Sequence, residues 1–483
     1  MTLMPAIRES AAKRFAPVVV ELDRSLTAES VFRALSGQPH AVFFDSAQRH
    51  DTLGRYSYVA ADPYAWIEAP ADGSPAIERL EACFEGLSAE RQPELPPWQG
   101  GAAGVLGYEI GKSLERLPSA RWDEFGMPAL AMGVYDTLVA FDHLEGRAWA
   151  LSQGLPETAP EARYRRASQR LEWLLGVIER GPCERKEGQD RLSQAELAPS
   201  YAIEGREGLL SDFSRDGYLH AVRETIELLR AGEAYQVNLS QRLLLPDPGD
   251  PVGLYLRLRE KNPAPFGGYL DGGAWQLASA SPERFLRVED NSVETRPIKG
   301  TRPRGSSAQE DSLLGDQLRA SEKDRAENVM IVDLLRNDLS RVCRDDSVVV
   351  PTLFGLEKYE HVQHLVSVVR GELRSGKRVG DLLRATLPGG SVTGAPKIRS
   401  MEIIAQLEPT ARGAYCGAMA WVGLPDSHGR KAMDSSVLIR TLTRSRGWVQ
   451  APVGGGVVVQ SDPEREYEET WHKAAGLIDA VQP

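Results

Sequence analysis

The order in which helix-like and strand-like segments follow one another is the strongest constraint on the fold of this chain. Ala41–Phe44 and Arg55–Ala60 are short β-rich runs bounded by turn residues. Asp212–Leu229 then shows the spacing of an amphipathic helix, and Ala234–Leu245 reads as a strand. Beyond that point the two patterns mix without the regular alternation of a doubly wound parallel sheet. The sequence therefore predicts an α+β fold with largely antiparallel sheets.

A change of composition divides the chain. Its 483 residues are enough for one large interwoven unit or for two domains. From residue 156 to 200, Glu, Arg, Gln and Pro become frequent around a helical stretch, Tyr164–Ile178. The Pro182–Ser200 part of this stretch is the best linker candidate, and it separates an N-terminal region, 1–205, from a C-terminal region, 206–483.

The overall charge excludes some classes of partner. The chain has 57 Lys and Arg against 68 Asp and Glu, a net charge of −11. A protein this acidic is not expected to bind nucleic acid or an anionic membrane, so an anionic substrate must be held by local features. Charges interrupt the N-terminus, and no apolar segment approaches a membrane span, so we expect neither export nor insertion. The widely spaced cysteines have no CxxC pair and fit a reducing cytoplasm better than a disulfide scaffold or a metal site: Cys83, Cys183, Cys343 and Cys416.

Two segments carry paired carboxylates. Asp324 and Glu327 lie one turn apart where apolar residues follow helical spacing. Glu466 and Glu469 repeat that spacing on a helix whose start, 461–464, offers a capping residue and a first-turn proline. If the four side chains converged, they would need a hard cation such as Mg²⁺ between them. Acidic pairs of this kind also occur on solvated helix faces, and the residues alone leave both interpretations open.

A glycine-containing loop, 388–397, precedes a helix through Ile398 and Leu407. Backbone N–H groups at such a start form a natural anion site, although a tight turn would need the same glycines. Gly394 is followed by Ala395 and not by lysine, so this is not a Walker A loop.

Gly454, Gly455 and Gly456 form a second glycine cluster. They lead into an expected strand, Val457–Val459, and such runs often mark only a bend. Arg440 ends an apolar run, and an arginine at the end of a buried strand is either paired structurally or directed at a substrate carboxylate.

Two further residues are candidates for acid, base or nucleophilic chemistry. Lys299 has cationic neighbours, which would lower its pKa and increase the nucleophilic fraction: Arg296, Arg302 and Arg304. Most lysines in basic stretches are simply solvated. Glu283 lies between apolar neighbours whose burial would raise its pKa for acid catalysis, although an ion pair with Arg284 is an equal alternative.

His364 falls in a β-branched stretch, 361–367, that looks like a strand, where a lone histidine is more often structural than catalytic. The chain has no GxSxG or GxCxG elbow, so no glutaminase nucleophile of the usual kind is encoded.

In this order, the motifs resemble those of the chorismate-utilising enzymes, which include anthranilate synthase component I, aminodeoxychorismate synthase component I, and the isochorismate and salicylate synthases. The resemblance covers nearly all of 206–483 through GEAYQVNLSQR, SPERF, PIKGTRPRG, DRAENVMIVDLLRND, HLVS, LPGGSVTGAPK, RTL and EREYEETWHKA. FFDSA and LGRYSYVAADP look like the family's N-terminal segment, where some members bind tryptophan. The resemblance implies a large interwoven two-layer α/β sandwich like anthranilate synthase component I, with 206–483 as the chorismate-binding catalytic domain.

Two positions separate the branches of that family. The water-adding branch carries a lysine base where this chain has Gln236, which disfavours that branch. Anthranilate synthases read PIAGT where this chain has Lys299 in PIKGT, and the lysine is typical of the aminodeoxychorismate branch. The resemblance therefore implies amination of chorismate at C4.

The resemblance also implies roles for individual residues. Lys299 would be the nucleophile and Glu283 the general acid, with His364 and Thr393 orienting the ring and the departing hydroxyl. Mg²⁺ would be held by Glu327 and Glu469, with Asp324 and Glu466 in supporting or water-mediated positions. The remaining contacts to the substrate carboxylates are implied for Tyr415, Arg440, Lys473 and the backbone around Gly394, Gly454 and Gly455.

The implied partners are chorismate, ammonia and a separate glutamine amidotransferase subunit. Because no lyase sequence follows Pro483, we expect the product to be the aminated intermediate on the way to 4-aminobenzoate and folate. The alternatives are anthranilate synthase component I, in tryptophan synthesis, and a regulatory subunit that binds tryptophan or chorismate without chemistry.

Overall fold

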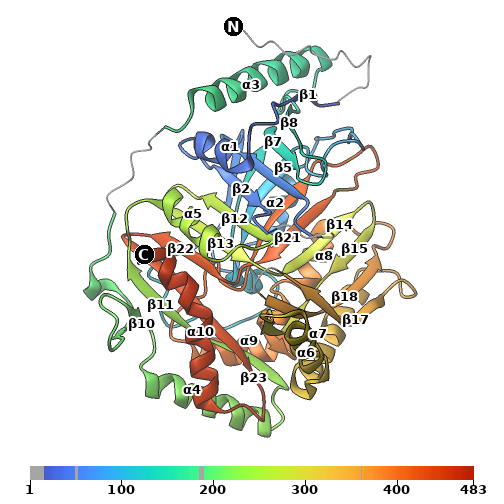
Figure 1. Cartoon of the computed structure of the whole chain (residues 1–483). Coiled ribbons are helices and arrows are strands. Elements are labelled where there is room, and N and C mark those ends of the chain that lie inside the picture. Colours follow the sequence, from blue (N-terminus) through green and yellow to red (C-terminus); the bar gives the residue numbers. More distant parts are fainter. Residues whose placement is uncertain (1–15, 49–52, 184–189, 360–361, 483) are drawn as a thin grey trace.

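The computed structural model describes residues 16–48, 53–183, 190–359 and 362–482, and within them the chain folds around two large sheets (Figure 1). The first sheet contains, in spatial order, β1 (Val18–Glu21), β8 (Arg147–Ser152), β7 (Thr137–Asp142), β3 (Tyr56–Ala60), β2 (Val42–Asp45), β12 (Phe266–Asp271), β13 (Trp275–Ser281), β22 (Thr441–Ser445), β23 (Trp448–Val457), β11 (Gln236–Pro246), β10 (Leu210–Ser211) and β9 (Tyr201–Ala202), with β19 (Gly394–Ala395) also paired to β11.

The second sheet contains, in spatial order, β16 (Ile298–Pro303), β18 (Val362–Glu372), β15 (Ser292–Thr295), β14 (Arg284–Glu289), β21 (Met433–Val437), β20 (Ala418–Gly423), β5 (Gly101–Leu106), β6 (Leu130–Tyr135) and β4 (Ala65–Ala69), with β17 (Val349–Lys358) paired to β18. Among the described residues, every ladder between these strands is antiparallel. The predicted α+β class with mostly antiparallel sheets is confirmed.

Both sheets take strands from both ends of the chain. Strand β2 pairs with β12 in the first sheet, and β5 pairs with β20 in the second. The regions 1–205 and 206–483 are therefore interwoven, and the division between them remains a division of the sequence. Part of the expected linker is also built onto the body, because Leu192 N donates to Arg446 O at 2.9 Å. Residues 184–189 of that linker lie outside the described residues.

Helices cover the sheets. They are α1 (Ala28–Leu35), α2 (Ala76–Ala82), α3 (Pro160–Arg180), α4 (Arg215–Arg230), α5 (Pro251–Lys261), α6 (Ala308–Ala320), α7 (Glu322–Ser340), α8 (Val379–Thr386), α9 (Lys397–Leu407) and α10 (Pro463–Val481), with short 3-10 turns η1 (Tyr108–Ser113), η2 (Gln194–Glu196) and η3 (Gly390–Val392). None of the helices in the described part of the chain is long and apolar enough to cross a membrane.

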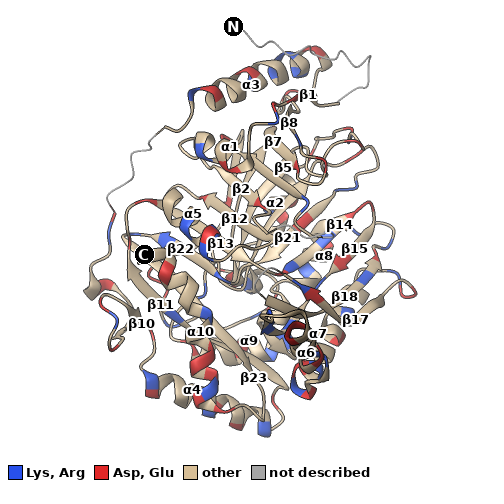
Figure 2. Ribbon diagram, viewed as in Figure 1, with Lys and Arg blue, Asp and Glu red and all other residues tan. Residues whose placement is uncertain are grey.

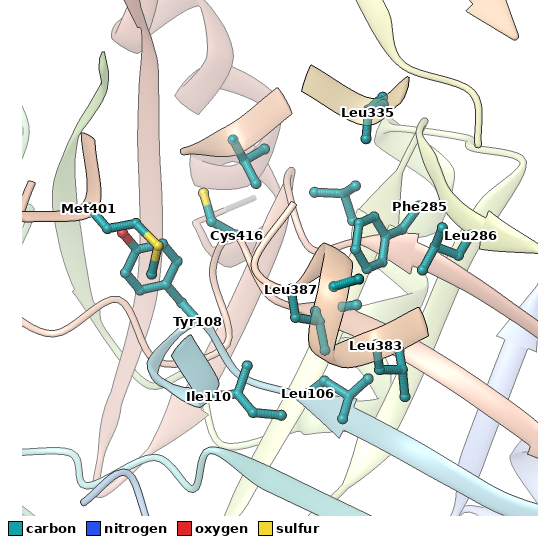
Figure 3. Packing of buried hydrophobic residues seen from close by; sticks show 14 of the residues in the cluster. Leu106, Tyr108, Ile110, Phe285, Leu286, Leu335, Leu383, Leu387, Met401 and Cys416 are labelled. Carbon is teal, nitrogen blue, oxygen red and sulfur yellow. The ribbon is translucent and has the colours of Figure 1, made fainter. Parts of the chain in front are cut away.

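Strand alternation separates the three largest hydrophobic cores in the described part of the chain. Leu270 of β12 and Leu277 of β13 point into the core between the two sheets, whereas their neighbours Tyr269 and Ala278 face the core under α1, α3, α5 and α10. The third core lies between the second sheet and helices such as α7 and α8, and Figure 3 shows Phe285, Leu335 and Leu383 within it. This arrangement fixes α7 and α10 on the body, and the site described next lies between them.

Candidate active site

The predicted carboxylate pairs lie on α7 and α10, as expected. Ser321 caps α7 by accepting a hydrogen bond from Asp324 N at 3.3 Å. Helix α10 is capped by Asp462, which accepts from Arg465 N, with Pro463 in the first turn. Ser461 lies before the cap and donates instead to Glu466 Oε1 at 2.7 Å. In Figure 2 acidic residues mark both helices.

The two helices border a cavity of about 470 Å³. Most of the predicted site residues line it: Glu283, Lys299, Asp324, Glu327, His364, Tyr415, Arg440, Gly454, Glu469 and Lys473. Three of the others do not line it but adjoin residues that do: Thr393, Gly455 and Glu466. Gly394 lies one residue further from the cavity than Thr393 and pairs with Val237 of β11. Segments that are far apart in the sequence thus form one site.

Lys299 lies on β16 and is partly buried, with Nζ donating to Ser391 O at 3.4 Å. Burial lowers the pKa of Lys299, the carboxylates of Glu327 and Glu283 oppose that shift, and Lys473 adds to it. The predicted direction agrees with this, but the predicted cause is wrong, because each neighbouring arginine pairs with an acid: Arg296 with Glu357, Arg302 with Asp324, and Arg304 with Asp311.

Glu283 precedes β14 and is only 5% exposed. Burial raises its pKa to about 7, while a hydrogen bond from the Ser391 hydroxyl (2.7 Å) and the charge of Lys299 oppose the shift. The alternative ion pair with Arg284 is wrong, because that side chain bonds to Asp434 and Glu294. Glu283 is therefore a carboxyl that exchanges protons near neutral pH.

His364 lies on β18 directly opposite Thr301 of β16, and its Nδ1 is 2.9 Å from Thr301 Oγ1. Burial, assisted by the charge of Arg440, lowers the pKa of His364 to about 4, so the imidazole is neutral at pH 7. Residue His361, at the start of the expected strand, lies outside the described residues. Sequence reasoning missed Thr301, since only the register of β16 on β18 reveals its contact.

The four carboxylates lie among cations. Lys323 Nζ is 3.9 Å from Glu327 Oε1 and 3.8 Å from Glu466 Oε1. Burial raises the pKa of both of these glutamates. Burial also tends to raise the pKa of Glu469, but Lys473 Nζ lies 2.6 Å from Glu469 Oε1 and stabilises the carboxylate. The pKa of Glu469 is therefore lowered. Among the described residues, no group of three or more His, Cys, Asp or Glu side chains is arranged to hold an ion. The magnesium site therefore remains a prediction.

Arg440 lies in the short segment between β21 and β22, immediately before the first residue of β22, and its φ of 52° lies in the left-handed region. Its side chain faces the cavity, and within the described part of the chain it forms no hydrogen bond or ion pair. Burial lowers the pKa of Arg440, but a guanidinium remains charged at neutral pH. Tyr415 and the charge of Glu469 oppose that shift, but no acid forms an ion pair with Arg440 in the described part of the chain, so its charge is available to a substrate anion.

The glycines of both loops allow close approach. A Cβ on Gly394 would lie 2.2 Å from Gln236 O, and φ there is 138°. A Cβ on Gly456 would lie 1.8 Å from Gln236 Nε2. The cluster 454–456 is part of β23, which ends at Val457, so the expected strand Val457–Val459 is wrong.

Thr393 is fully buried behind the lining, where its hydroxyl donates to Gly389 O at 3.0 Å. Its predicted contact with the substrate stays a prediction. Lys397, the lysine that ends this loop, also points away from the cavity and pairs with Asp338 at 2.7 Å. Several polar lining residues were given no role from the sequence, although all but Lys323 lie inside the quoted motifs: Asn238, Thr301, Lys323, Ser391 and His472.

A second cavity, of about 280 Å³, lies between the two sheets. It is lined by residues of both N-terminal motifs, including Phe44 and Ser46 of FFDSA and Tyr56 and Tyr58 of the tyrosine-containing motif. Trp421 and Phe266 contribute further large rings. The two motifs that carry the N-terminal resemblance thus meet at one place.

Comparison with known proteins places these sites in context. A family model described as chorismate binding enzyme matches residues 39–479. The anthranilate synthase component 1 of Thermus thermophilus is 42% identical over 405 residues, which cover 83% of this chain and 82% of that protein. The aminodeoxychorismate synthase component 1 of Escherichia coli is 35% identical over 485 residues, which cover 97% and 100%. The crystal structure of anthranilate synthase component I from Streptococcus pneumoniae superposes with a TM-score of 0.72 at 31% identity, covering 88% of this chain and 92% of that one.

Proposed function

The chain belongs to the family of chorismate binding enzymes, and on that premise we propose that it aminates chorismate at C4 to give 4-amino-4-deoxychorismate. One observation carries the proposal: Lys299, an amine with a lowered pKa, lines the same cavity as Glu283, a carboxyl with a pKa of about 7. These are the ionisation properties that a nucleophile and a general acid need at neutral pH.

The cavity supports binding of a dicarboxylate. Arg440 forms no ion pair among the described residues, although the charge of Glu469 acts on it, and Tyr415 and Asn238 also line the cavity. Lys473 lies 2.8 Å from Gly454 O, at the wall where backbone groups of β23 are accessible. His364 is neutral and is held by Thr301, so it would orient the ring without adding charge.

The reaction proceeds by two displacements. The neutral amine of Lys299 attacks C2, both ring double bonds shift by one position toward C4, and the C4–O bond breaks while Glu283 gives its proton to the departing hydroxyl, which leaves as water. Ammonia then forms a bond to C4, the double bonds return, and the bond between C2 and Lys299 breaks. A proton from the added ammonia returns to Glu283, so the sum is chorismate and ammonia in, product and water out.

Magnesium is proposed at the acidic end of the cavity. Carboxylate oxygens are the ligands that this hard cation prefers, and Glu327 and Glu469 would hold it, with Asp324 and Glu466 in supporting or water-mediated positions. Bound there, Mg²⁺ would neutralise the ring carboxylate of the substrate. Lys323 and Lys473, which now pair with these acids, would have to turn aside.

Ammonia is proposed to come from a glutamine amidotransferase subunit. The relatives are named component 1, and the GxSxG and GxCxG elbows of a glutaminase nucleophile are absent from the sequence. Cys83, Cys343 and Cys416 are free thiols, and the cysteines are widely spaced in the sequence, so we place the reaction in a reducing cytoplasm, in the route to 4-aminobenzoate and folate.

Product analysis tests the proposal. The protein is incubated with chorismate, ammonium chloride and MgCl₂, and the products are separated by chromatography and identified by mass. We expect 4-amino-4-deoxychorismate, which requires an added lyase to become 4-aminobenzoate. Anthranilate and pyruvate without a lyase would refute it and support anthranilate synthesis, the activity of the 42% identical relative.

A tryptophan site is proposed in the second cavity, because its aromatic lining from β2, β3 and β20 suits an indole ring. Calorimetric titration with tryptophan tests it, with phenylalanine as the control ligand. A purely regulatory role for the whole chain is a separate alternative, and unchanged turnover in the double variant Lys299→Ala, Glu283→Ala would support it.

A further inference from the structure

Ser391 touches both groups of the proposed acid and nucleophile pair. Its hydroxyl donates to Glu283 Oε1 at 2.7 Å, and its backbone carbonyl accepts from Lys299 Nζ at 3.4 Å. It lies in η3, is 9% exposed and lines the cavity. The acid and the amine come from separate parts of the second sheet, so this serine is a direct physical link between them.

The loop that carries Ser391 is fixed from behind. Leu334 Cδ2 of α7 would be 2.5 Å from a Cβ on Gly390, so α7 packs tightly on the residue before the serine. Arg412 Nη1 donates to Val392 O at 3.1 Å, on the residue after it. Asn238 N donates to Thr393 O at 2.9 Å. The serine is therefore held by three independent elements, and its position is set before substrate binds.

We propose that Ser391 is a positioning residue that sets the orientation of Glu283 and Lys299 relative to each other. The inference rests on the proposed function and adds a role for Ser391, which lies in the quoted motif LPGGSVTGAPK but was given no role there. The carbonyl of Ser391 takes one N–H of Lys299, so the lone pair of the neutral amine is directed away from the serine. The hydroxyl holds one oxygen of Glu283, which leaves the other oxygen for the departing group.

The Ser391 hydroxyl also influences the pKa of Glu283, and so the pH range in which this carboxyl is protonated. The groups that face this carboxyl are the Ser391 hydroxyl, the ammonium of Lys299 and the buried thiol of Cys416. A donor to the carboxylate stabilises its charged form, so removing the donor raises the pKa of Glu283. A general acid must be protonated, and its rate falls as pH rises through that pKa. The basic limb of the pH profile is the range in which kcat/KM falls as pH rises. Loss of the hydroxyl therefore moves the basic limb to higher pH.

The test measures kcat/KM for chorismate consumption with ammonium between pH 6 and pH 9.5. For Ser391→Ala we expect a fall of about ten- to a hundredfold at pH 7, and a basic limb displaced upward by about one pH unit, as for loss of one hydrogen bond to a charged group. Ser391→Thr keeps the hydroxyl, so kcat/KM should fall over the same pH range as in the wild-type protein. The matched control is Ser279→Ala, since Ser279 is as buried and bonds to Thr441 at 2.9 Å outside the cavity.

A lower rate with an unmoved limb in Ser391→Ala would overturn the proposal, because that is the result of a structural role alone. If Ser391→Ala does not fold, Ser391→Cys asks the same question, since a thiol is a weaker donor of similar size and should move the limb in the same direction. Failure of the proposed function is recognised separately: it appears as wild-type turnover in Glu283→Ala or Lys299→Ala, whatever the Ser391 variants do.

Discussion

Replacing Arg412 with methionine should strongly destabilise the protein, although Arg412 lies outside the cavity lining. Its side chain is 2% exposed and forms two bonds to Glu408, at 2.8 Å from Nε and 2.6 Å from Nη2. It also donates to the carbonyls of Val392 and Asn238. A methionine side chain at this position would keep much of the volume but none of these bonds.

The size of the destabilisation follows from the buried groups that lose the arginine as a partner. Glu408 is 5% exposed and would keep only Ser240 N and Oγ as donors, both at 2.8 Å. Removing one partner of a buried ion pair costs about 3–5 kcal/mol, and each carbonyl that loses its donor adds about 1 kcal/mol. Relaxation around the site offsets part of this. We expect the free energy of unfolding to fall by about 4 kcal/mol, close to a thousandfold in the folding equilibrium.

Urea denaturation followed by tryptophan fluorescence measures this change. The control is Arg384→Met, which removes the partly exposed pairs with Glu78 and Glu81 and should cost less than about 1 kcal/mol. In the double variant Arg412→Met, Glu408→Gln the buried charge is gone, so about 2 kcal/mol should return. A loss below about 1 kcal/mol for Arg412→Met, or no recovery in the double variant, would refute the reasoning.

Other predictions concern the cavity itself. Lys299→Ala should lower chorismate turnover at least about a hundredfold. Mass spectrometry after a rapid quench should detect a chorismate adduct on Lys299 of the wild-type protein and none on the variant. An adduct on the variant would contradict the assignment of Lys299 as the nucleophile. Burial raises the pKa of Glu283 to about 7, and the acid form is the active one, so kcat/KM should fall about tenfold per pH unit above pH 7. In Glu283→Gln most activity should be lost, and the activity that remains should not show this decrease above pH 7. Arg440→Met should raise the Kd for chorismate about ten- to a hundredfold, measured by calorimetry, with little change in melting temperature because no described residue pairs with it; equal affinity would exclude it from binding.

The parts of the site that were predictable are those set by local periodicity. Asp324 and Glu327, or Glu466 and Glu469, share a helix face because three residues make nearly one turn, and that holds wherever the helix packs. The antiparallel α+β class followed in the same way from the order of elements. Both inferences need only neighbours in the chain.

The parts that were not predictable depend on contacts between distant segments. Ser391 and Glu283 are 108 residues apart, and Thr301 meets His364 only through strand register. The pKa of Lys299 was attributed to adjacent arginines because they are visible in the sequence, whereas burial in the folded protein is the larger cause. The left-handed conformation of Arg440 likewise occurs where the chain passes from β21 in the second sheet to β22 in the first, and no glycine marks it.

The cavity resolves the apparent conflict between an acidic protein and a dianionic substrate. Five cationic side chains line it, from Lys299, Arg302, Lys323, Arg440 and Lys473, against four carboxyl groups, from Glu283, Asp324, Glu327 and Glu469. One of those carboxyls has a pKa of about 7 and so carries only part of a charge at neutral pH. The lining is therefore positive within a chain whose net charge is −11. A proposed dianion and Mg²⁺ would enter with no net charge between them and so leave this balance unchanged. Burial favours the neutral form of Lys299 that attack requires, against the charges of Glu327 and Glu283.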